Sequence, residues 1–228
     1  MVKRSILTAV LVFCGQLLFA GDVANFINLG FSIDSKYFMF GEYGMTENSV
    51  AYASISAVEV ARDKFASDGV RSGQYRGVFQ AGQDGLGALL NLLSDNAAFS
   101  KRFRIDHLLT GRELYLLVDG QEPKPSLEFR DFQTGNSFVV TLNQSQSQDG
   151  DVSASFSIDV TIQAQAGKPQ HYSVGLPNFK RPGVENYRIR RIVLSPDNRS
   201  LVFVIERQEK DQNGANVRFM VDTLVIDP

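Results

Sequence analysis

Two stretches of the chain share one order of apolar and polar residues. Each has an apolar residue, a Ser-x-Asp triplet, two or three further polar residues and a continuous apolar run; they are residues 31–40 and 194–203. Ser and Asp side chains can bond the backbone two residues on, so each triplet predicts a tight turn. The apolar run that follows predicts a buried strand. We therefore expect two related β-units, one towards each end of the chain.

The Ser-x-Asp triplets are interpreted as structural turns. They contain Ser32 with Asp34 in the first unit and Ser195 with Asp197 in the second. A carboxylate at such a place could instead serve catalysis or hold a metal ion. Because both Asp residues occupy the same position of a repeated pattern, we expect them to stabilise the turns by accepting local hydrogen bonds.

Most of the remaining chain consists of short apolar runs between turn residues, which is typical of β-structure. Strands are predicted at residues 37–40, 50–60, 114–118, 127–132, 137–142, 154–162, 200–205 and 219–226. The last two are apolar on both faces. We therefore expect both of them in the interior of a sheet that is covered on each side.

One segment, residues 84–109, has helical spacing instead. Its apolar residues recur three or four positions apart, and Asp84 can cap its start; they are Leu86, Leu89, Leu90, Leu93 and Ala97. Polar residues 94–96 are expected to break or restart the helix. The predicted fold is mainly β, with antiparallel sheets in a partial propeller-like or sandwich arrangement and one inserted helical segment near residues 84–109.

Residues 1–20 have the layout of a secretory signal peptide. Lys3 and Arg4 precede an apolar run that ends at the small residue Ala20, and the run is short for a membrane span. We expect cleavage after residue 20, export to the periplasm or the medium, and a single mainly-β domain over residues 21–228. No later apolar stretch reaches the roughly 20 residues of a transmembrane helix, so none is expected after cleavage.

Charge and cysteine content exclude several classes of function. Without residues 1–20 the chain has 21 Lys and Arg against 25 Asp and Glu, a net charge of −4, which argues against nucleic-acid binding. The only cysteine, Cys14, lies in the signal segment, so disulfides and thiolate chemistry are excluded afterwards. His107 and His171 are far apart, and no nucleotide-loop, serine-hydrolase or zinc-hydrolase motif is present. We expect no metal site, no cofactor and no motif-borne catalytic residue.

Residues 177–191 form the least ordinary polar stretch, because cations and aromatic residues are concentrated in it. One interpretation is a stiff basic loop that binds an anion or a partner through Lys180, Arg181, Tyr187, Arg188 and Arg190. The other is a solvated loop whose Arg stems lie over a sheet. The sequence leaves both open.

The two turn-and-strand stretches resemble the blade motif of bacterial periplasmic β-propellers of the TolB type. In that motif an apolar-Ser-Pro-Asp-Gly-Lys sequence precedes a strand. Residues 194–203 match it with Pro196, whereas Ile33 replaces the proline in residues 31–40. A regular closed propeller is not expected, because no copy appears near Ser72, where the next should fall, and the helical segment occupies its neighbourhood.

The chain after residue 20 resembles more closely a bacterial family of predicted secreted proteins of unknown function. Those proteins share a Gly-Phe-Ser-Pro-Asp-Gly-Arg-Tyr-Phe-like stretch, matched by residues 30–38, and a Tyr-Arg-Ile-like stretch, matched by residues 187–189. These are turn and strand motifs rather than chemical ones. The resemblance therefore implies export and no particular activity.

Our first functional hypothesis is a non-catalytic periplasmic binding or envelope-assembly protein, whose partner is an unknown protein or envelope component. The alternatives are a hydrolase that uses carboxylates, since such sites leave no local motif, and a structural subunit of a larger envelope complex. Buried carboxylates that converge in a cleft would favour the hydrolase. A flat apolar or basic patch would favour the binding protein.

Overall fold

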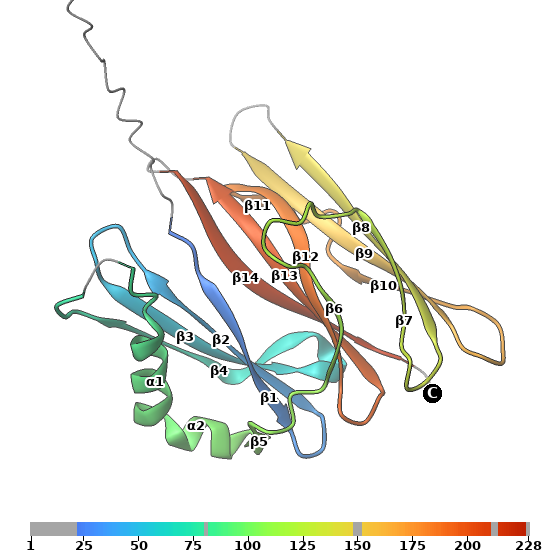
Figure 1. Cartoon of the computed structure of the whole chain (residues 1–228), viewed down its shortest axis with the longest axis horizontal. Helices are drawn as coiled ribbons and strands as arrows, with labels where there is room; N and C mark the ends of the chain where they lie inside the picture. Colours follow the sequence, from blue (N-terminus) through green and yellow to red (C-terminus); the bar gives the residue numbers. More distant parts are fainter. Residues whose placement is uncertain (1–21, 80–81, 148–151, 211–213, 227–228) are drawn as a thin grey trace, which may run out of the picture.

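The computed structural model describes residues 22–79, 82–147, 152–210 and 214–226, and its strands form three antiparallel sheets (Figure 1). The predicted signal peptide lies outside the described residues. The first sheet has the order β4-β3-β2-β1-β5. Its strands are β1 (Asn25–Ser32), β2 (Tyr37–Met45), β3 (Ala51–Glu59), β4 (Lys64–Tyr75) and β5 (Ile105–Asp106).

The other two sheets are built from the rest of the chain. The central sheet has the order β14-β13-β12-β6, with β6 (Arg112–Leu116), β12 (Val184–Leu194), β13 (Ser200–Lys210) and β14 (Ala215–Val225). The third sheet has the order β10-β9-β8-β7, and the short β11 (Arg181–Pro182) also pairs with β9. Its strands are β7 (Ser126–Arg130), β8 (Ser137–Ser147), β9 (Ser153–Gln163) and β10 (Gln170–Gly175).

The three sheets stack face to face, with the central sheet between the other two (Figure 1). Ile192, Phe203 and other side chains on one face of the central sheet form a core with the third sheet. Val193 and Val202, on the opposite face, pack against Phe31 and Phe38 of the first sheet. The arrangement is therefore sandwich-like, and the described residues do not form a closed ring. The resemblance to TolB-type propellers is not confirmed.

The helical segment covers the outer face of the first sheet. Helix α1 (Leu86–Asp95) and helix α2 (Ala97–Arg102) are separated at Asn96, as the polar residues 94–96 indicated. Leu89 and Phe99 pack against Met39 and Ile55 of the sheet. The helical structure ends earlier than expected, because Arg104 adopts a left-handed conformation (φ 55°) and the chain then enters β5.

The repeated turns have matching hydrogen bonds. Ser32 Oγ donates to Asp34 Oδ1 over 2.8 Å, and Ser195 Oγ donates to Asp197 Oδ1 over 2.6 Å. In each turn the serine Oγ also accepts the backbone N–H at the start of the next strand, that of Tyr37 or Ser200. The two turns therefore hold equivalent ends of the first and central sheets in the same way.

The expectation for the two C-terminal strands is half right. Strand β13 lies inside the central sheet, between β12 and β14. Strand β14 is the last strand on that side rather than an interior one, and only its beginning is extended by an isolated parallel bridge between Val23 and Val217. Its apolar character has another cause: both faces are covered by neighbouring sheets, although one edge is open.

Candidate functional site

A cleft of about 700 Å³ lies along the open edge of β14. Strand β14 forms its floor with residues 219–222. The first sheet forms one wall with residues of β2, β3 and β4, and the end of β10 with Arg181 forms the other. The central sheet ends at β14 in the described chain, while its two neighbours continue past that edge. The cleft, named here the edge cleft, is the space that this difference leaves.

Two acidic side chains hold the edge of β14: Glu42 on β2 and Asp63 in the connection between β3 and β4. Glu42 accepts the backbone N–H of Phe219, and Asp63 accepts the backbone N–H of Thr223 over 2.6 Å. Burial raises the pKa of both carboxyl groups above its ordinary value, although these hydrogen bonds oppose the rise. Charged side chains at an open strand edge also hinder pairing with another strand. Both residues thus have a structural role.

Between these two positions, the backbone of Val221 is left without a partner. Along a strand, every second residue directs its N–H and C=O groups to the same edge. Phe219 and Thr223 direct their N–H groups away from β13. Because the register between β14 and β13 is regular here, the N–H and C=O groups of Val221 also point away from β13. No hydrogen bond to either of these two groups of Val221 occurs among the described residues. The edge cleft therefore presents one free donor and one free acceptor.

Asp222 is the third carboxylate of the edge cleft, and it has no such structural partner. The residue is only 7% exposed, yet its side chain has no hydrogen bond within the described chain. Burial and the nearby negative charge of Asp63 raise the pKa of Asp222 to about 7, which Arg181 partly opposes. A buried carboxyl group without a partner, placed in a cleft, is a candidate functional group.

The rest of the lining combines apolar and cationic groups. Phe65, Val70 and Leu176 line the cleft and are substantially exposed to solvent. Arg181 lies over the rings of Phe156, Phe179 and Tyr187 at 5.5, 5.3 and 5.9 Å, which orients its guanidinium at the wall. Apolar surface with a few convergent polar groups is typical of ligand sites.

Of the residues in the predicted basic site, only Arg181 lines the edge cleft. Lys180 is exposed on the connection before β11, while Tyr187 is only 1% exposed and donates from its hydroxyl to the Ala154 carbonyl. Arg188 pairs with Glu206, and Arg190 pairs with both Glu206 and Asp119. Residues 184–191 belong to strand β12, so the stretch is not one loop, and a shared binding role for its residues stays a prediction.

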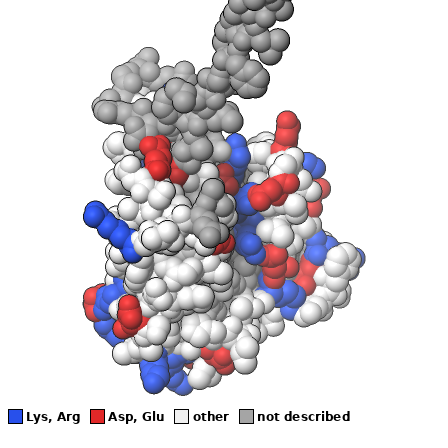
Figure 2. Space-filling model, turned by 60° about the vertical axis from the view of Figure 1, so that its left-hand side comes forward, with Lys and Arg blue, Asp and Glu red and all other residues white. Residues whose placement is uncertain are grey.

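Charged side chains are unevenly spread over the surface. Figure 2 shows cationic and acidic side chains close together in a band on the right of that view, beside a broad area with few charges. Ion pairs such as Arg191–Glu113 and Arg190–Asp119 pair cations with acids at distances of 2.8 and 2.7 Å. Most Arg side chains of β12 are therefore neutralised locally, which weakens the expectation of a basic patch there.

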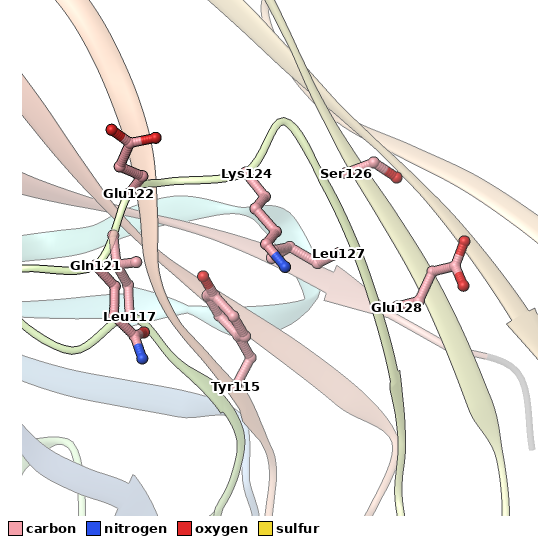
Figure 3. A pocket seen from close by; sticks show the side chains of 8 residues that line it. All are labelled: Tyr115, Leu117, Gln121, Glu122, Lys124, Ser126, Leu127 and Glu128. Atoms are coloured by element: carbon pink, nitrogen blue, oxygen red, sulfur yellow. The ribbon is translucent and has the colours of Figure 1, made fainter.

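A second cavity of about 700 Å³ lies between β6, the connection after it and β7 (Figure 3). The Tyr115 hydroxyl and the Lys124 ammonium point into the same space, whereas Glu122 and Glu128 point away from it. Burial raises the pKa of Tyr115, which keeps its hydroxyl protonated. Without a buried charge at its base, this cavity offers less chemistry than the edge cleft.

The described residues contain no group of three His, Cys, Asp or Glu side chains that could hold a metal ion. His107 Nδ1 lies 2.7 Å from the Leu29 carbonyl, and His171 Nδ1 lies 2.9 Å from Thr161 Oγ1. The two histidines are thus engaged in separate local contacts, His107 in the connection after β5 and His171 on β10. Nor does the described part of the chain contain a helix long and apolar enough to span a bilayer.

Comparison with known proteins identifies the family. A family model described as "Predicted secreted protein (DUF2259)" matches residues 39–224. A search of curated proteins and a search of solved structures gave no significant match. The matched region includes most strands of all three sheets and all three carboxylates of the edge cleft. The chain therefore belongs to the DUF2259 family of predicted secreted proteins, in agreement with the export expected from its sequence.

Proposed function

We propose that the protein is an exported, non-catalytic binding protein and that the edge cleft is its ligand site. The volume of about 700 Å³ falls within the range of roughly 300–1,000 Å³ that is usual for ligand pockets. Its exposed apolar residues offer contact area, and its polar groups can fix the orientation of a ligand. These properties support binding without requiring a reaction.

Asp222 carries this proposal. The Asp222 carboxyl group is largely desolvated and accepts no hydrogen bond within the described chain, and a cationic or N–H group of a ligand would stabilise its ionised form. The free N–H and C=O groups of Val221 match one peptide unit. The cleft thus suits a peptide-like ligand with a cationic side chain: its backbone pairs with Val221 and its charge meets Asp222.

Strand addition along the whole edge is not part of this proposal. Glu42 and Asp63 already occupy the N–H groups of Phe219 and Thr223, two residues to either side of Val221. A longer incoming strand would have to displace both carboxylates. Contact with a single peptide unit needs no such displacement, so a short or bent ligand segment fits the edge better than an extended strand.

The test uses two ligands that differ by a single terminal ammonium group. N-acetyl-lysine-N-methylamide and N-acetyl-norleucine-N-methylamide share two peptide units and a linear side chain, but only the first is cationic. Titrated into ¹⁵N-labelled protein, the lysine derivative should shift the amide signals of Val221 and its neighbours and bind more tightly. Asp222→Asn should abolish the difference, while Asp119→Asn, at an exposed carboxylate outside the cleft, should preserve it.

Two results would refute the binding proposal. One is the absence of any shift at residues of the edge cleft with either derivative. The other is a preference for lysine that persists in Asp222→Asn. The matched control matters because any loss of negative charge weakens cation binding slightly at low salt.

A carboxylate-based hydrolase is the second candidate, favoured by the pKa of Asp222. A carboxyl group with a pKa of about 7 is suited to exchange protons near neutral pH. The other two carboxylates in the cleft, Glu42 and Asp63, are held by backbone N–H groups, so a second free carboxylate is lacking. Hydrolysis of chromogenic peptides or glycosides that Asp222→Asn abolishes would establish this alternative in place of the first.

A further inference from the structure

Arg181 and Asp222 are oppositely charged side chains that line the edge cleft without pairing with each other. Asp222 lies on the floor of the cleft, and Arg181 lies on the wall formed with the end of β10. The positive charge of Arg181 lowers the pKa of Asp222 against the effect of burial, so the two groups interact through space. Within the described chain neither side chain forms an ion pair. Both charges are therefore open to a ligand.

The guanidinium of Arg181 is held in place before a ligand arrives. Its backbone belongs to β11, where Arg181 pairs with Ala154 of β9. The guanidinium lies over the buried rings of Phe156 and Tyr187, and the ring of Phe179 lies at a similar distance. One of its N–H groups also donates to the Tyr187 hydroxyl over 3.4 Å. Because the side chain is already ordered, binding through it costs little conformational entropy.

Most hydrogen-bond donors of this guanidinium are unused. Within the described chain the bond to Tyr187 is the only hydrogen bond that the Arg181 side chain makes. Arg181 is half-buried and lines the cleft, so a ligand can reach the group. A guanidinium presents parallel N–H groups whose spacing matches the two oxygens of a carboxylate. A fixed guanidinium with free donors is thus well suited to bind a carboxylate.

The other cations of the cleft lining are less suited to this role. Arg62 and Arg207 each form an ion pair with a nearby glutamate. Lys64 is exposed at the start of β4, and an ammonium group does not offer the paired donors of a guanidinium. Arg181 is therefore the lining cation that best fits a carboxylate, and Lys64 provides a matched control.

The positive and negative charges of the lining nearly cancel, since Arg62, Lys64, Arg181 and Arg207 stand against Glu42, Asp63 and Asp222. Net charge thus favours neither a simple anion nor a simple cation. The cleft instead offers separate groups of opposite sign beside the free backbone of Val221. Such an arrangement is complementary to a ligand that carries a carboxylate, a cation and a peptide unit.

These three groups must come from about one residue of the ligand, because Glu42 and Asp63 limit backbone contact to a single peptide unit. A basic residue inside a peptide has no free carboxylate, whereas one at the carboxyl terminus has. We propose that the edge cleft binds the carboxyl-terminal basic residue of a peptide, and this inference rests on the ligand role proposed for the cleft. Arg181 binds the terminal carboxylate, Asp222 the side-chain cation, and Val221 the last peptide unit.

The test compares N-acetyl-lysine, whose carboxylate is free, with N-acetyl-lysine-N-methylamide. Each is titrated into ¹⁵N-labelled wild-type protein at low salt and about pH 8, where Asp222 is largely ionised. The free acid should bind about tenfold more tightly, because only it forms charge-assisted hydrogen bonds with Arg181. The side-chain Nε–H signal of Arg181 should shift with the free acid and not with the methylamide.

Three variants assign the preference for the free acid to Arg181. Arg181→Gln should abolish this preference yet keep that for the lysine over the norleucine methylamide, which depends on Asp222. Arg181→Lys should retain part of the preference. Lys64→Gln removes the same charge from the same cleft and should leave most of it. Melting temperatures show whether the variants fold, and the Nε–H signal of the wild type decides if Arg181→Gln does not.

The inference and the function on which it rests fail in different ways. Equal affinity of the wild type for the two lysine derivatives would overturn the inference and leave the edge cleft as a binding site. A preference for the free acid that survives in Arg181→Gln, or that Lys64→Gln reduces as much, would also overturn it. The absence of any shift in the cleft with either derivative would refute the binding function itself, and the inference with it.

Discussion

Asp63 and Thr223 join the first sheet to the central sheet, although 160 positions separate them in the sequence. Asp63 Oδ1 accepts both the backbone N–H of Thr223, at 2.6 Å, and its hydroxyl, at 3.2 Å. Together with the bond from Phe219 to Glu42, this contact gives two N–H groups of the open edge of β14 side-chain acceptors instead of a further strand, and the backbone groups of Val221 between them stay free. Because single side chains rather than a further strand bond to that edge, space is left beside β14, and this space is the edge cleft.

Replacing Asp63 should therefore destabilise the junction of the two sheets. Asp63→Ala leaves the buried N–H of Thr223 without an acceptor, so we expect the free energy of unfolding to fall by about 1–3 kcal/mol. Asp63→Asn retains an acceptor oxygen and should cost less. Urea denaturation measures both variants, and equal losses would contradict the role assigned to the hydrogen bond.

The two repeated turns should respond alike to loss of their Asp residues. Asp34→Ala and Asp197→Ala each remove a hydrogen bond to a serine and one to a backbone N–H, so each should cost on the order of 1 kcal/mol. The Asn variants, which keep an acceptor, serve as controls. A variant that loses a binding activity while its stability is unchanged would show that its Asp has a functional role.

Arg112 should contribute more than an ordinary surface cation. Its partner Asp131 is only 3% exposed, and the loss of Arg112 leaves that carboxylate without its ion pair. Because Arg112 itself is 27% exposed, we expect Arg112→Ala to cost roughly 2–4 kcal/mol, somewhat below the range for fully buried pairs. Arg112→Lys keeps the positive charge but not the guanidinium geometry, so its stability should lie between those of the wild type and Arg112→Ala. A loss below 0.5 kcal/mol, the usual size for surface substitutions, would contradict this interpretation.

Asp222 should make the protein less stable as the pH rises. Its folded-state pKa of about 7 exceeds the ordinary value of 3.8, so the folded state binds more protons between these pH values. Stability therefore falls from pH 4 to pH 7 and then levels off. One pKa unit corresponds to about 1.4 kcal/mol. The free energy of unfolding of Asp222→Asn, relative to that of the wild type, should therefore rise by roughly 2–4 kcal/mol as the pH is raised from 4 to 8. A difference that does not vary with pH would contradict this.

The repeated turns, the interrupted helical segment and the buried strand β13 could be predicted because each depends on local patterns. Ser32 and Asp34 lie within a few residues of the groups they bond, and the helical spacing of α1 is visible in one short window. Strands β1, β4, β10 and β12 were not among the predicted strands, and β4 and β10 show one reason. Both are edge strands with few apolar residues, so their pairing depends on a neighbouring strand rather than on their own sequence.

The edge cleft was not predictable in the same way. Its carboxylates come from Glu42, Asp63 and Asp222, which meet only because two sheets stack. One local signal existed: Asp222 is the only acid in the mostly apolar run of residues 219–225. The sequence instead indicated the basic stretch as a binding site. Tyr187 and Arg190 of that stretch lie in strand β12, where Tyr187 is buried in the core and Arg190 forms an ion pair.

Titration of the Asp222 carboxyl carbon by NMR, with and without N-acetyl-lysine-N-methylamide, tests the central claim most directly. We predict a pKa of about 7 in the free protein and a lower pKa at saturating ligand, because a bound cation favours the ionised carboxylate. The norleucine derivative should cause no such fall. A pKa close to 3.8 in the free protein, or one that the lysine derivative leaves unchanged, would contradict the assignment of Asp222 as the group that recognises a cationic ligand.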